Sequence, residues 1–372
     1  MSRLRTGEVP WHLLLLALVL TGVGLLFVHS TANTSEQFSR LDEKQLLFVA
    51  ASLLLFAGTL ALPIQWLREL AAPAYLVCLL LLIGLFWFGV RLNGAVRWYH
   101  ILGFGLQPSE FTKLALILLL AQYLRFRSRA GWVESLAVPV VLAAIPAFLV
   151  MRQPDLGSSM VFFPVMLAMS YAAGASGRQI GGLTAGAAAL GVLAWPHLHD
   201  YQRLRVLMWW RQDHLTAAEL AGPGYQMHQS LIAVGSAGWT GFGYQQGPQN
   251  RLDFLPFRSV DYIFAVVVEE IGILGAAAVL LGFLLLVLGH YLLALRIRER
   301  FSRLVVVGVG TWLGTQAFIH ASVCTSLLPA TGLPMPFFSA GGSALLTAFL
   351  ALGLVCNVAA RQEPVLAPDG FE

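Results

Sequence analysis

The segment QNRLDFLPFRSVDYIFAVVVEE, residues 249–270, places two Asp and two Glu beside a strongly apolar run. Asp261 directly precedes this run, whereas Asp253 lies in the loop before it. A carboxylate at the mouth of a membrane-spanning helix is half desolvated, which raises its pKa and marks it as a candidate functional group. The residues alone leave Asp253 and Asp261 both open as candidates for chemistry, and helix capping is the alternative role of Asp261. Glu269 and Glu270 lie about two helical turns deeper, where we expect internal ion pairs, for instance with Lys113.

A second polar group stands in RWYHILGFGLQPSEFTKLAL, residues 97–116. Pro108 suits the first turn of a helix, because its missing N–H has no intrahelical partner there. Glu110 then lies near the positive helix start, and Lys113 follows three residues later on the same face. The pair is either a stabilising ion pair or part of an anion or substrate site. Arg97 and Trp98 precede it, as interfacial anchors or as substrate contacts.

Two shorter segments stand out, one for its charged residues and the other for prolines that interrupt a helix. In RQPDLGSSM, residues 152–160, Asp155 is placed to cap the following helix, and Arg152 is either an outer anchor or a phosphate contact. In LLPATGLPMPFFSAGGSALL, residues 327–346, Pro329, Pro334 and Pro336 forbid a continuous helix. This apolar, broken segment is either a plain outer loop or irregular backbone that lines a cavity.

The elements that must position these residues are membrane-spanning helices. The 372 residues are 58% hydrophobic and only 11% charged, with a mean hydropathy of +0.73, which is far outside the range of soluble domains. The basic residues behind the net charge of +4 lie in short spacers between apolar runs rather than on one polar surface, which argues against a nucleic-acid binder. Three scattered cysteines in apolar runs form neither a disulfide framework nor a metal site: Cys78, Cys324 and Cys356.

Ten apolar runs predict a single polytopic, all-α membrane domain over residues 1–372. They span about 11–29, 45–62, 71–90, 108–124, 133–151, 157–174, 179–196, 262–288, 304–326 and 340–360. Arg3 and Arg5, RFRSR at 125–129 and RIRERFSR at 296–303 mark the inner side, whereas fewer basic residues, such as Arg40, stand in the short outer loops. Both termini are therefore expected in the cytoplasm.

The longest loop, residues 197–261 between the seventh and eighth spans, is expected on the outer face. YQRLRVLMWW at 201–210 has the pattern of an interfacial helix, and the glycine-rich SLIAVGSAGWTGFG at 230–243 is too short to span. It is either re-entrant or lies along the surface. The residues alone thus support two classes of function: an enzyme acting on a lipid-linked outer-leaflet substrate, or a transporter of a charged or polar solute.

Four of these segments together resemble the SEDS (shape, elongation, division and sporulation) family. They are RWYHILGFGLQPSEFTKLA, RQPDLGSS, residues 224–275 and LLPATGLPMPFFSAGGSALL, with HDYQRLRV at 199–206 as a fifth. The form QNRLDFLP favours the RodA branch over the division paralogue FtsW. The resemblance implies a ten-helix peptidoglycan glycosyltransferase of the bacterial cytoplasmic membrane. It would polymerise lipid II on the outer face, release undecaprenyl diphosphate and work with a class B penicillin-binding protein.

The resemblance also separates the two aspartates, because the essential carboxylate of the family pattern matches Asp261 rather than Asp253. Asp261 would accept the proton of the acceptor sugar hydroxyl, while Arg groups or a divalent cation such as Mg²⁺ stabilise the departing diphosphate. No metal site can be read from the sequence. The residues predicted to bind substrate are Arg97, Trp98, Arg152, Arg203, Arg258 and Gln229, with Arg205, Arg211 and Arg251 also available in the outer loop. Supporting roles are predicted for Glu110, Lys113, Asp155, Glu269 and Glu270.

The chain departs from the family pattern close to the proposed site. Phe257, Ser259 and Val260 stand where the pattern often has Glu, His and Thr, Ala340 replaces a usual Tyr, and His320 replaces a usual Asn. These departures motivate a diverged, non-catalytic scaffold as one alternative function. A lipid II translocator is the other, with Glu110, Lys113, Glu269 and Glu270 as parts of a hydrophilic path.

Overall fold

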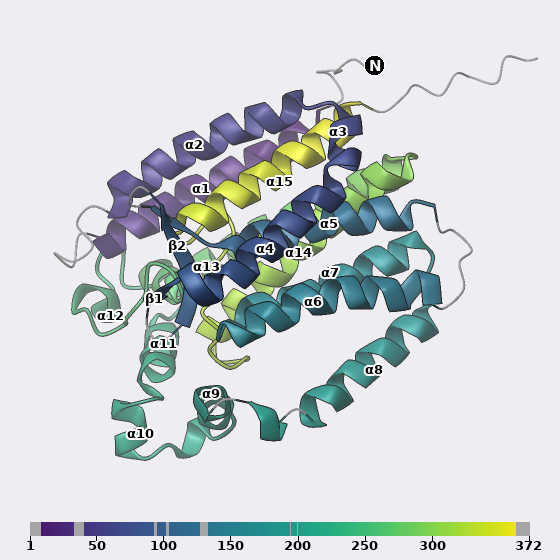
Figure 1. Ribbon diagram of the computed structural model, residues 1–372. Coiled ribbons are helices and arrows are strands. Elements are labelled where there is room, and N and C mark those ends of the chain that lie inside the picture. The colour runs from purple at the N-terminus through teal and green to yellow at the C-terminus, as the bar shows by residue number, and fades with distance from the viewer. Residues whose placement is uncertain are drawn as a thin grey trace, which may run out of the picture.

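The computed structural model describes residues 9–32, 41–92, 95–101, 104–126, 133–193, 195–198 and 200–361. Arg3, Arg5, Arg40, Arg127 and Arg129, which served to orient the chain in the membrane, lie outside these residues. The described part is a bundle of long helices, with the strands and the short helices between residues 200 and 251 at one end and the short helix of residues 64–69 at the other, as Figure 1 shows.

The long helices follow the apolar runs of the sequence. They are α1 (Trp11–Ala32), α2 (Leu41–Ala61), α4 (Ala71–Phe88), α5 (Pro108–Leu124), α6 (Val138–Arg152), α7 (Leu156–Ala173), α8 (Gly177–Leu193), α13 (Ile263–Arg296), α14 (Arg300–Cys324) and α15 (Gly342–Ala360). Within the described residues, eight helical segments are long and apolar enough to cross a membrane, the fourth of them running from Ser135 to Arg152. The other two helices, α5 and α8, have 17 residues each and coincide with the remaining predicted runs.

The shorter elements lie between the long helices. They are α3 (Ile64–Glu69), β1 (Val90–Leu92), β2 (Ala95–Ile101), β3 (Phe104–Leu106), the π-helix η3 (Val133–Ala137), the 3₁₀ turns η4 (Trp195–His197) and η5 (Gln212–His214), α9 (Asp200–Trp210), α10 (Ala217–Ala221), α11 (Tyr225–Ser236) and α12 (Pro248–Arg251). The strands form an antiparallel meander in the order β1-β2-β3. The described chain is therefore mostly helical rather than all-α, because residues 90–92, 95–101 and 104–106, expected as a loop between two spans, pair as strands.

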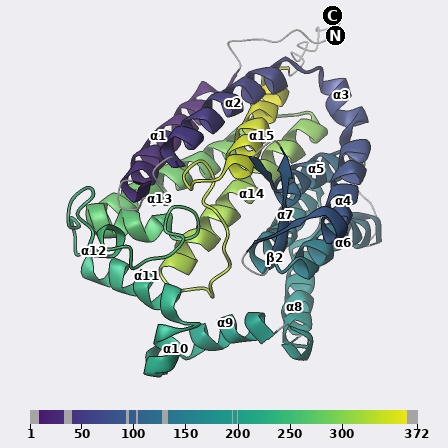
Figure 2. The ribbon, with the colours of Figure 1, turned by 60° about the vertical axis from the view of Figure 1, so that its left-hand side comes forward.

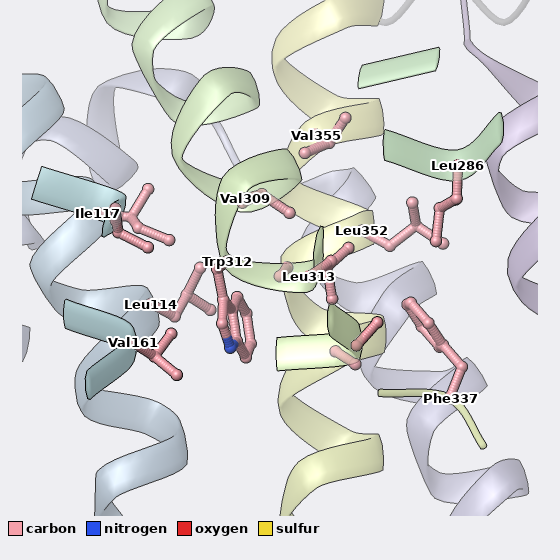
Figure 3. Packing of buried hydrophobic residues seen from close by; sticks show 14 of the residues in the cluster. Leu114, Ile117, Val161, Leu286, Val309, Trp312, Leu313, Phe337, Leu352 and Val355 are labelled. Atoms are coloured by element: carbon pink, nitrogen blue, oxygen red, sulfur yellow. The ribbon is translucent and has the colours of Figure 1, made fainter. Parts of the chain in front are cut away.

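The core of the bundle is built around α14 and α15. In their apolar windows 78% and 89% of the residues are buried, against 28% in α4 and α13, so these two helices are the innermost spans. Figure 3 shows Trp312 of α14 facing Leu114 of α5, with Leu313 on the side of α15. Helix α8 lies at the other extreme: it has no buried residue and stands apart from the bundle in Figures 1 and 2.

Helix α13 is interrupted where a loop inserts against it. Gly272 has φ 70° and ψ −175°, a conformation that glycine adopts readily. The N–H groups of residues 242 and 243 donate to the carbonyl oxygens of Glu269 and Glu270, at 3.0 and 2.9 Å. Those of residues 273 and 274 donate to the carbonyls of residues 238 and 239, at 3.1 and 3.2 Å. The glycine-rich segment thus satisfies the backbone groups that the kink frees, as broken helices at membrane depth require.

Candidate functional site

Asp261 lines a cavity of about 430 Å³ at the end of the bundle that carries the strands and α9–α12. We call this cavity the Asp261 chamber. Its other walls come from β2, the start of α5, α9, α11 and the broken segment before α15, through Arg97, Trp98, Gln107, Arg205, Gln226 and Gly332 among others. The chamber therefore joins residues from most of the segments that the sequence singled out.

The Asp261 carboxylate is partly exposed, and no described residue donates a hydrogen bond to it. Gly332 lies against it: a Cβ atom at residue 332 would stand 3.5 Å from Asp261 Oδ2. Burial raises the pKa of Asp261 to about 6. The nearby Arg97 and Arg205 guanidinium groups lower this pKa, and the Asp155 carboxylate adds to the increase. The result is an unpartnered carboxylate whose pKa suits proton transfer near neutral pH.

Arg97 is held at the chamber by the turn that precedes α7. Its guanidinium donates to the carbonyl of Pro154, and its Nη1 lies 3.8 Å from Asp155 Oδ1. Asp155 is the N-cap of α7, as predicted, since its side chain accepts from the Ser158 N–H at 3.1 Å. The Gln107 amide donates to the other Asp155 oxygen at 3.2 Å. Arg97 Nε is buried and has no hydrogen-bond partner among the described residues.

Arg205 supplies a second cation from α9, the helix expected at 201–210. Its Nη1 donates to the carbonyl of Ala330 at 3.1 Å, and its guanidinium lies 5.9 Å from the ring centroid of Tyr201. Within the described part of the chain, no group of three or more His, Cys, Asp or Glu side chains could hold a metal ion. The charges that the chamber itself offers to an anionic group are those of Arg97 and Arg205.

A larger cavity, of about 650 Å³, adjoins the Asp261 chamber. Arg97, Arg205 and Gln226 line both cavities. The remaining walls of the larger one include Tyr201, Tyr225 and Tyr262, and we call it the tyrosine chamber.

The wall of the Asp261 chamber at residues 332–334 is fixed by α14. Gln316 Nε2 donates to the carbonyl of Pro334 at 2.9 Å, and His320 Nδ1 lies 2.7 Å from the carbonyl of Leu333. Gln316 Oε1 accepts from Lys113 Nζ at 2.8 Å and from Trp312 Nε1 at 2.7 Å. These contacts leave the Gln316 amide only one orientation, with its N–H₂ group toward the chamber wall.

Lys113 and Glu110 form the ion pair that their spacing predicts, with Nζ and Oε1 2.8 Å apart. Both side chains are buried, at 1% and 0% exposure, and neither lines a chamber. The expected pairing of Lys113 with Glu269 or Glu270 is therefore wrong.

Glu269 instead accepts from the backbone N–H groups of Gln249 and Asn250, at 2.6 and 3.1 Å. Glu270 Oε1 accepts from Ser30 Oγ at 2.5 Å and from Asn250 Nδ2 at 2.7 Å. The two glutamates thus hold the loop before Asp261 against α13 and α1.

Four residues predicted to bind substrate lie outside the linings of both chambers: Arg152, Arg203, Arg258 and Gln229. Arg152 is exposed beside Phe148, and Arg203 donates to the carbonyl of Pro196. Arg258 is buried and pairs with Asp253, which gives Asp253 a structural contact.

Several lining residues escaped the sequence interpretation, among them Gln107, Gln226 and Gly332 of the Asp261 chamber and Tyr225 and Tyr262 of the tyrosine chamber. Gln107 and Gly332 stand in segments already singled out, and Gln226 lies one turn before Gln229 on α11. The sequence therefore identified these segments as functional but not which of their residues line the chamber. Among the departures from the family pattern, Phe257, Val260 and Ala340 line the Asp261 chamber. Ser259 and His320 are buried behind it.

Comparison with known proteins places this geometry in context. Residues 10–363 match the model of a family of cell cycle proteins that takes in FtsW, RodA and SpoVE. A probable peptidoglycan glycosyltransferase FtsW of Geobacter metallireducens is 34% identical over 370 residues, covering 94% of each chain. The peptidoglycan glycosyltransferase MrdB of Escherichia coli K12 is 32% identical over 327 residues, covering 88% of this chain and 87% of MrdB.

Two solved structures resemble this chain over more than nine-tenths of its length. A chain from a peptidoglycan synthase complex, studied for its coordination of polymerisation and crosslinking, has a TM-score of 0.80 at 29% identity and covers 94% of this chain and 97% of its own. The rod shape determining protein RodA of Thermus thermophilus has a TM-score of 0.72 at 27% identity, with coverages of 95% and 97%.

Proposed function

The chain belongs to the FtsW, RodA and SpoVE family of cell cycle proteins, and we propose that it is a peptidoglycan glycosyltransferase that polymerises lipid II. The observation that carries this proposal is the unpartnered Asp261 carboxylate, which shares a chamber with two arginines beside a second cavity. A polymerase must hold two lipid-linked sugars at once. Two adjoining cavities fit that requirement, with the base in the wall of one and the two cations in the walls of both.

The reaction transfers a sugar from diphosphate to a hydroxyl group. The acceptor hydroxyl oxygen attacks the anomeric carbon of the donor, and the bond from that carbon to the diphosphate oxygen breaks. The diphosphate leaves with the bonding electrons, and the hydroxyl proton passes to Asp261. A carboxylate with a pKa of about 6 is mostly ionised at neutral pH and can accept this proton.

Arg97 and Arg205 would stabilise the negative charge that develops on the leaving diphosphate. They line both chambers, so a diphosphate between the two would contact both guanidinium groups. Guanidinium groups match phosphate oxygens in geometry and remain charged at every physiological pH. Each such preorganised contact contributes typically about 3 kcal/mol to transition-state stabilisation.

The chain is a multi-pass protein of the cytoplasmic membrane, and its chambers are expected on the outer face with both termini inside. The basic segments at 125–129 and 296–303 support this orientation. The similarity to a chain from a peptidoglycan synthase complex supports a class B penicillin-binding protein as the partner that crosslinks the strands. Relatives named FtsW and MrdB match to similar identity, so the RodA branch rests on the QNRLDFLP segment and on the RodA structure.

The translocator alternative loses the observation that motivated it. Glu110, Lys113, Glu269 and Glu270 were candidates for a hydrophilic path, but all four are at most 1% exposed and all accept or donate hydrogen bonds inside the bundle. Purified protein incubated with labelled lipid II, with and without its cognate penicillin-binding protein, tests the proposal. Glycan polymer is the expected product. Movement of lipid II across vesicle membranes with no polymer would refute it.

A further inference from the structure

A hollow of about 290 Å³ lies along helices α6 and α7, which run side by side in Figure 1. We call it the α6–α7 groove. It shares no lining residue with either chamber, and the proposed reaction does not use it. Its lining comes from one face of each helix, because the residues recur every three or four positions: Val140, Ala144, Phe148 and Met151 on α6, and Phe163 and Met166 on α7, among others.

The groove exists because small side chains of α6 lie beside large ones of α7. Ala143, Ala144 and Ala147 leave space along α6 that the aromatic side chains of α7 do not fill. The floor of the groove is buried, at Ala143 and Phe162, whereas its rim is open, with Phe148 53% exposed. In a chain that spans a membrane, such an exposed apolar groove opens into lipid hydrocarbon rather than into water.

The lining of the groove offers a ligand no free polar group. Among the described residues of the lining, Ser159 alone has a polar side chain, and its hydroxyl donates to the carbonyl of Leu156 at 2.7 Å. A sugar, a nucleotide or a peptide would have polar groups without partners here, which costs free energy in apolar surroundings. The ligand that fits this lining is a hydrocarbon chain.

The length of the groove matches one leaflet of a bilayer. On α6 it extends from Val140 to Met151, which at 1.5 Å per residue is about 16 Å, half of a hydrocarbon core of roughly 30 Å. It ends on the side of the chambers, because Pro154, just beyond Met151, accepts a hydrogen bond from Arg97 of both chamber walls. An acyl chain of a phospholipid in that leaflet fits this length, whereas a polyprenyl chain is much longer.

Arg152 stands at this end of the groove. It is the last residue of α6 and follows Met151 of the lining, and its guanidinium lies 5.8 Å from the ring centroid of Phe148. The side chain is exposed, and no described residue forms an ion pair with it. The sequence predicted Arg152 either as an outer anchor or as a phosphate contact. A guanidinium at the end of an acyl-chain groove complements the phosphate of an anionic headgroup.

We propose that the α6–α7 groove binds an anionic phospholipid of the outer leaflet, with one acyl chain along the groove and the phosphate at Arg152. This site goes beyond the glycosyltransferase reaction, since none of its residues lines a chamber. The bound lipid stabilises the helix pair whose connecting turn holds Arg97, through the Pro154 carbonyl and the Asp155 carboxylate.

The test uses photo-crosslinking to the purified full chain in nanodiscs of phosphatidylcholine. The probe is phosphatidylglycerol with a diazirine on one acyl chain, and mass spectrometry maps the labelled peptides. Unlabelled phosphatidylglycerol, phosphatidylcholine and undecaprenyl phosphate serve as competitors. Thermal unfolding confirms beforehand that each variant is folded.

Two pairs of variants separate the groove from the headgroup contact. Ala144→Trp fills the groove, and Ile145→Trp places the same side chain at the next exposed position of α6, outside the lining. Arg152→Gln removes the phosphate contact, and Arg178→Gln removes an exposed arginine at the start of α8, which also lies outside the lining. The second member of each pair is the matched control.

The unaltered protein should be labelled within residues 138–166. Phosphatidylglycerol should compete about fivefold better than phosphatidylcholine, the factor expected from one arginine near an anionic headgroup. Ala144→Trp should lose the label, whereas Arg152→Gln should keep the label and lose the headgroup preference. Both control variants should behave as the unaltered protein does.

The groove is overturned as the site if labelling occurs only elsewhere, persists in Ala144→Trp or is lost equally in Ile145→Trp. The headgroup contact is overturned if Arg152→Gln keeps the preference for phosphatidylglycerol. If undecaprenyl phosphate displaces the probe better than phosphatidylglycerol does, the occupant is a polyprenyl lipid and the proposed phospholipid is wrong. No readout depends on polymerisation, so these outcomes are independent of the proposed glycosyltransferase activity.

Discussion

We predict that Lys113 stabilises the fold rather than contacting substrate, and Lys113→Met tests this. The substitution removes the 2.8 Å ion pair with Glu110, the hydrogen bond to Gln316 and the position over the Trp312 ring at 5.3 Å. It leaves the Glu110 carboxylate, which is 0% exposed, without its counter-charge. Breaking one side of a buried pair costs about 3–5 kcal/mol, far more than an exposed ion pair contributes.

The matched control is the double variant Glu110→Leu with Lys113→Met. Replacing a buried ion pair by apolar residues of similar volume is often close to neutral, because the desolvation penalty of both charges disappears together. The double variant should therefore be more stable than Lys113→Met alone, with a coupling free energy of about 3 kcal/mol.

Thermal unfolding of the purified proteins in detergent measures this difference, and the lipid II assay follows activity in parallel. The reasoning is refuted if Lys113→Met retains normal stability while losing polymerisation, because that result would make Lys113 a substrate contact. It is equally refuted if the double variant is as unstable as the single one.

Three further outcomes follow from the site. The polymerisation rate should rise with pH through about 6 and then level, because burial raises the pKa of Asp261 to about 6 and the base must be ionised. In Arg97→Gln the midpoint of this pH–rate profile should move upward, since a cation that lowers the pKa of Asp261 is lost. An unshifted profile would contradict the proximity of the two groups. Gly332→Ala should lose activity, because the new methyl group would stand 3.5 Å from Asp261 Oδ2, where the acceptor must approach. Its stability cost should be only about 1 kcal/mol, which arises from the φ angle of 69° at this residue. Thermal unfolding and the polymerisation assay, run together, separate the two effects. Glu269→Gln should destabilise the protein by about 1–3 kcal/mol, because the glutamine amide can accept from only one of the two backbone N–H groups that Glu269 satisfies. Limited proteolysis of the 244–260 loop measures this loss of anchoring. Unchanged protection of the loop would argue against an anchoring role of Glu269.

Features that depend on neighbours within one turn of helix could be predicted from the sequence. The Asp155 cap and the Glu110–Lys113 pair are of this kind, because backbone geometry alone brings their partners within reach. The long apolar runs also became helices close to their expected bounds. The strands at 90–106 were missed although the sequence has Asn93-Gly94, a hairpin signal, because the surrounding apolar composition favoured a span followed by a loop.

Features that depend on contacts between distant segments could not be predicted in the same way. The carboxyl groups of Glu269 and Glu270 need hydrogen-bond partners inside the bundle, but only the tertiary structure shows that Gln249, Asn250 and Ser30 supply them rather than Lys113. From the sequence, Arg203 and Arg258 were predicted to bind substrate, and Arg205 was named only as also available. In the structure Arg205 lines both chambers, whereas Arg258 pairs with Asp253, because the packing of α9 and of the 252–260 loop fixes which way each side chain faces.

The most direct test of the central claim is polymerisation of labelled lipid II by Asp261→Asn, with Asp253→Asn as the matched control from the same segment. Asparagine keeps the size of the side chain but cannot accept the hydroxyl proton. The structure pairs Asp253 with Arg258, away from both chambers. We therefore predict that folded Asp261→Asn forms almost no glycan, about 10²-fold less or lower, whereas Asp253→Asn retains polymerisation. Normal polymerisation by Asp261→Asn would contradict the assignment of Asp261 as the base.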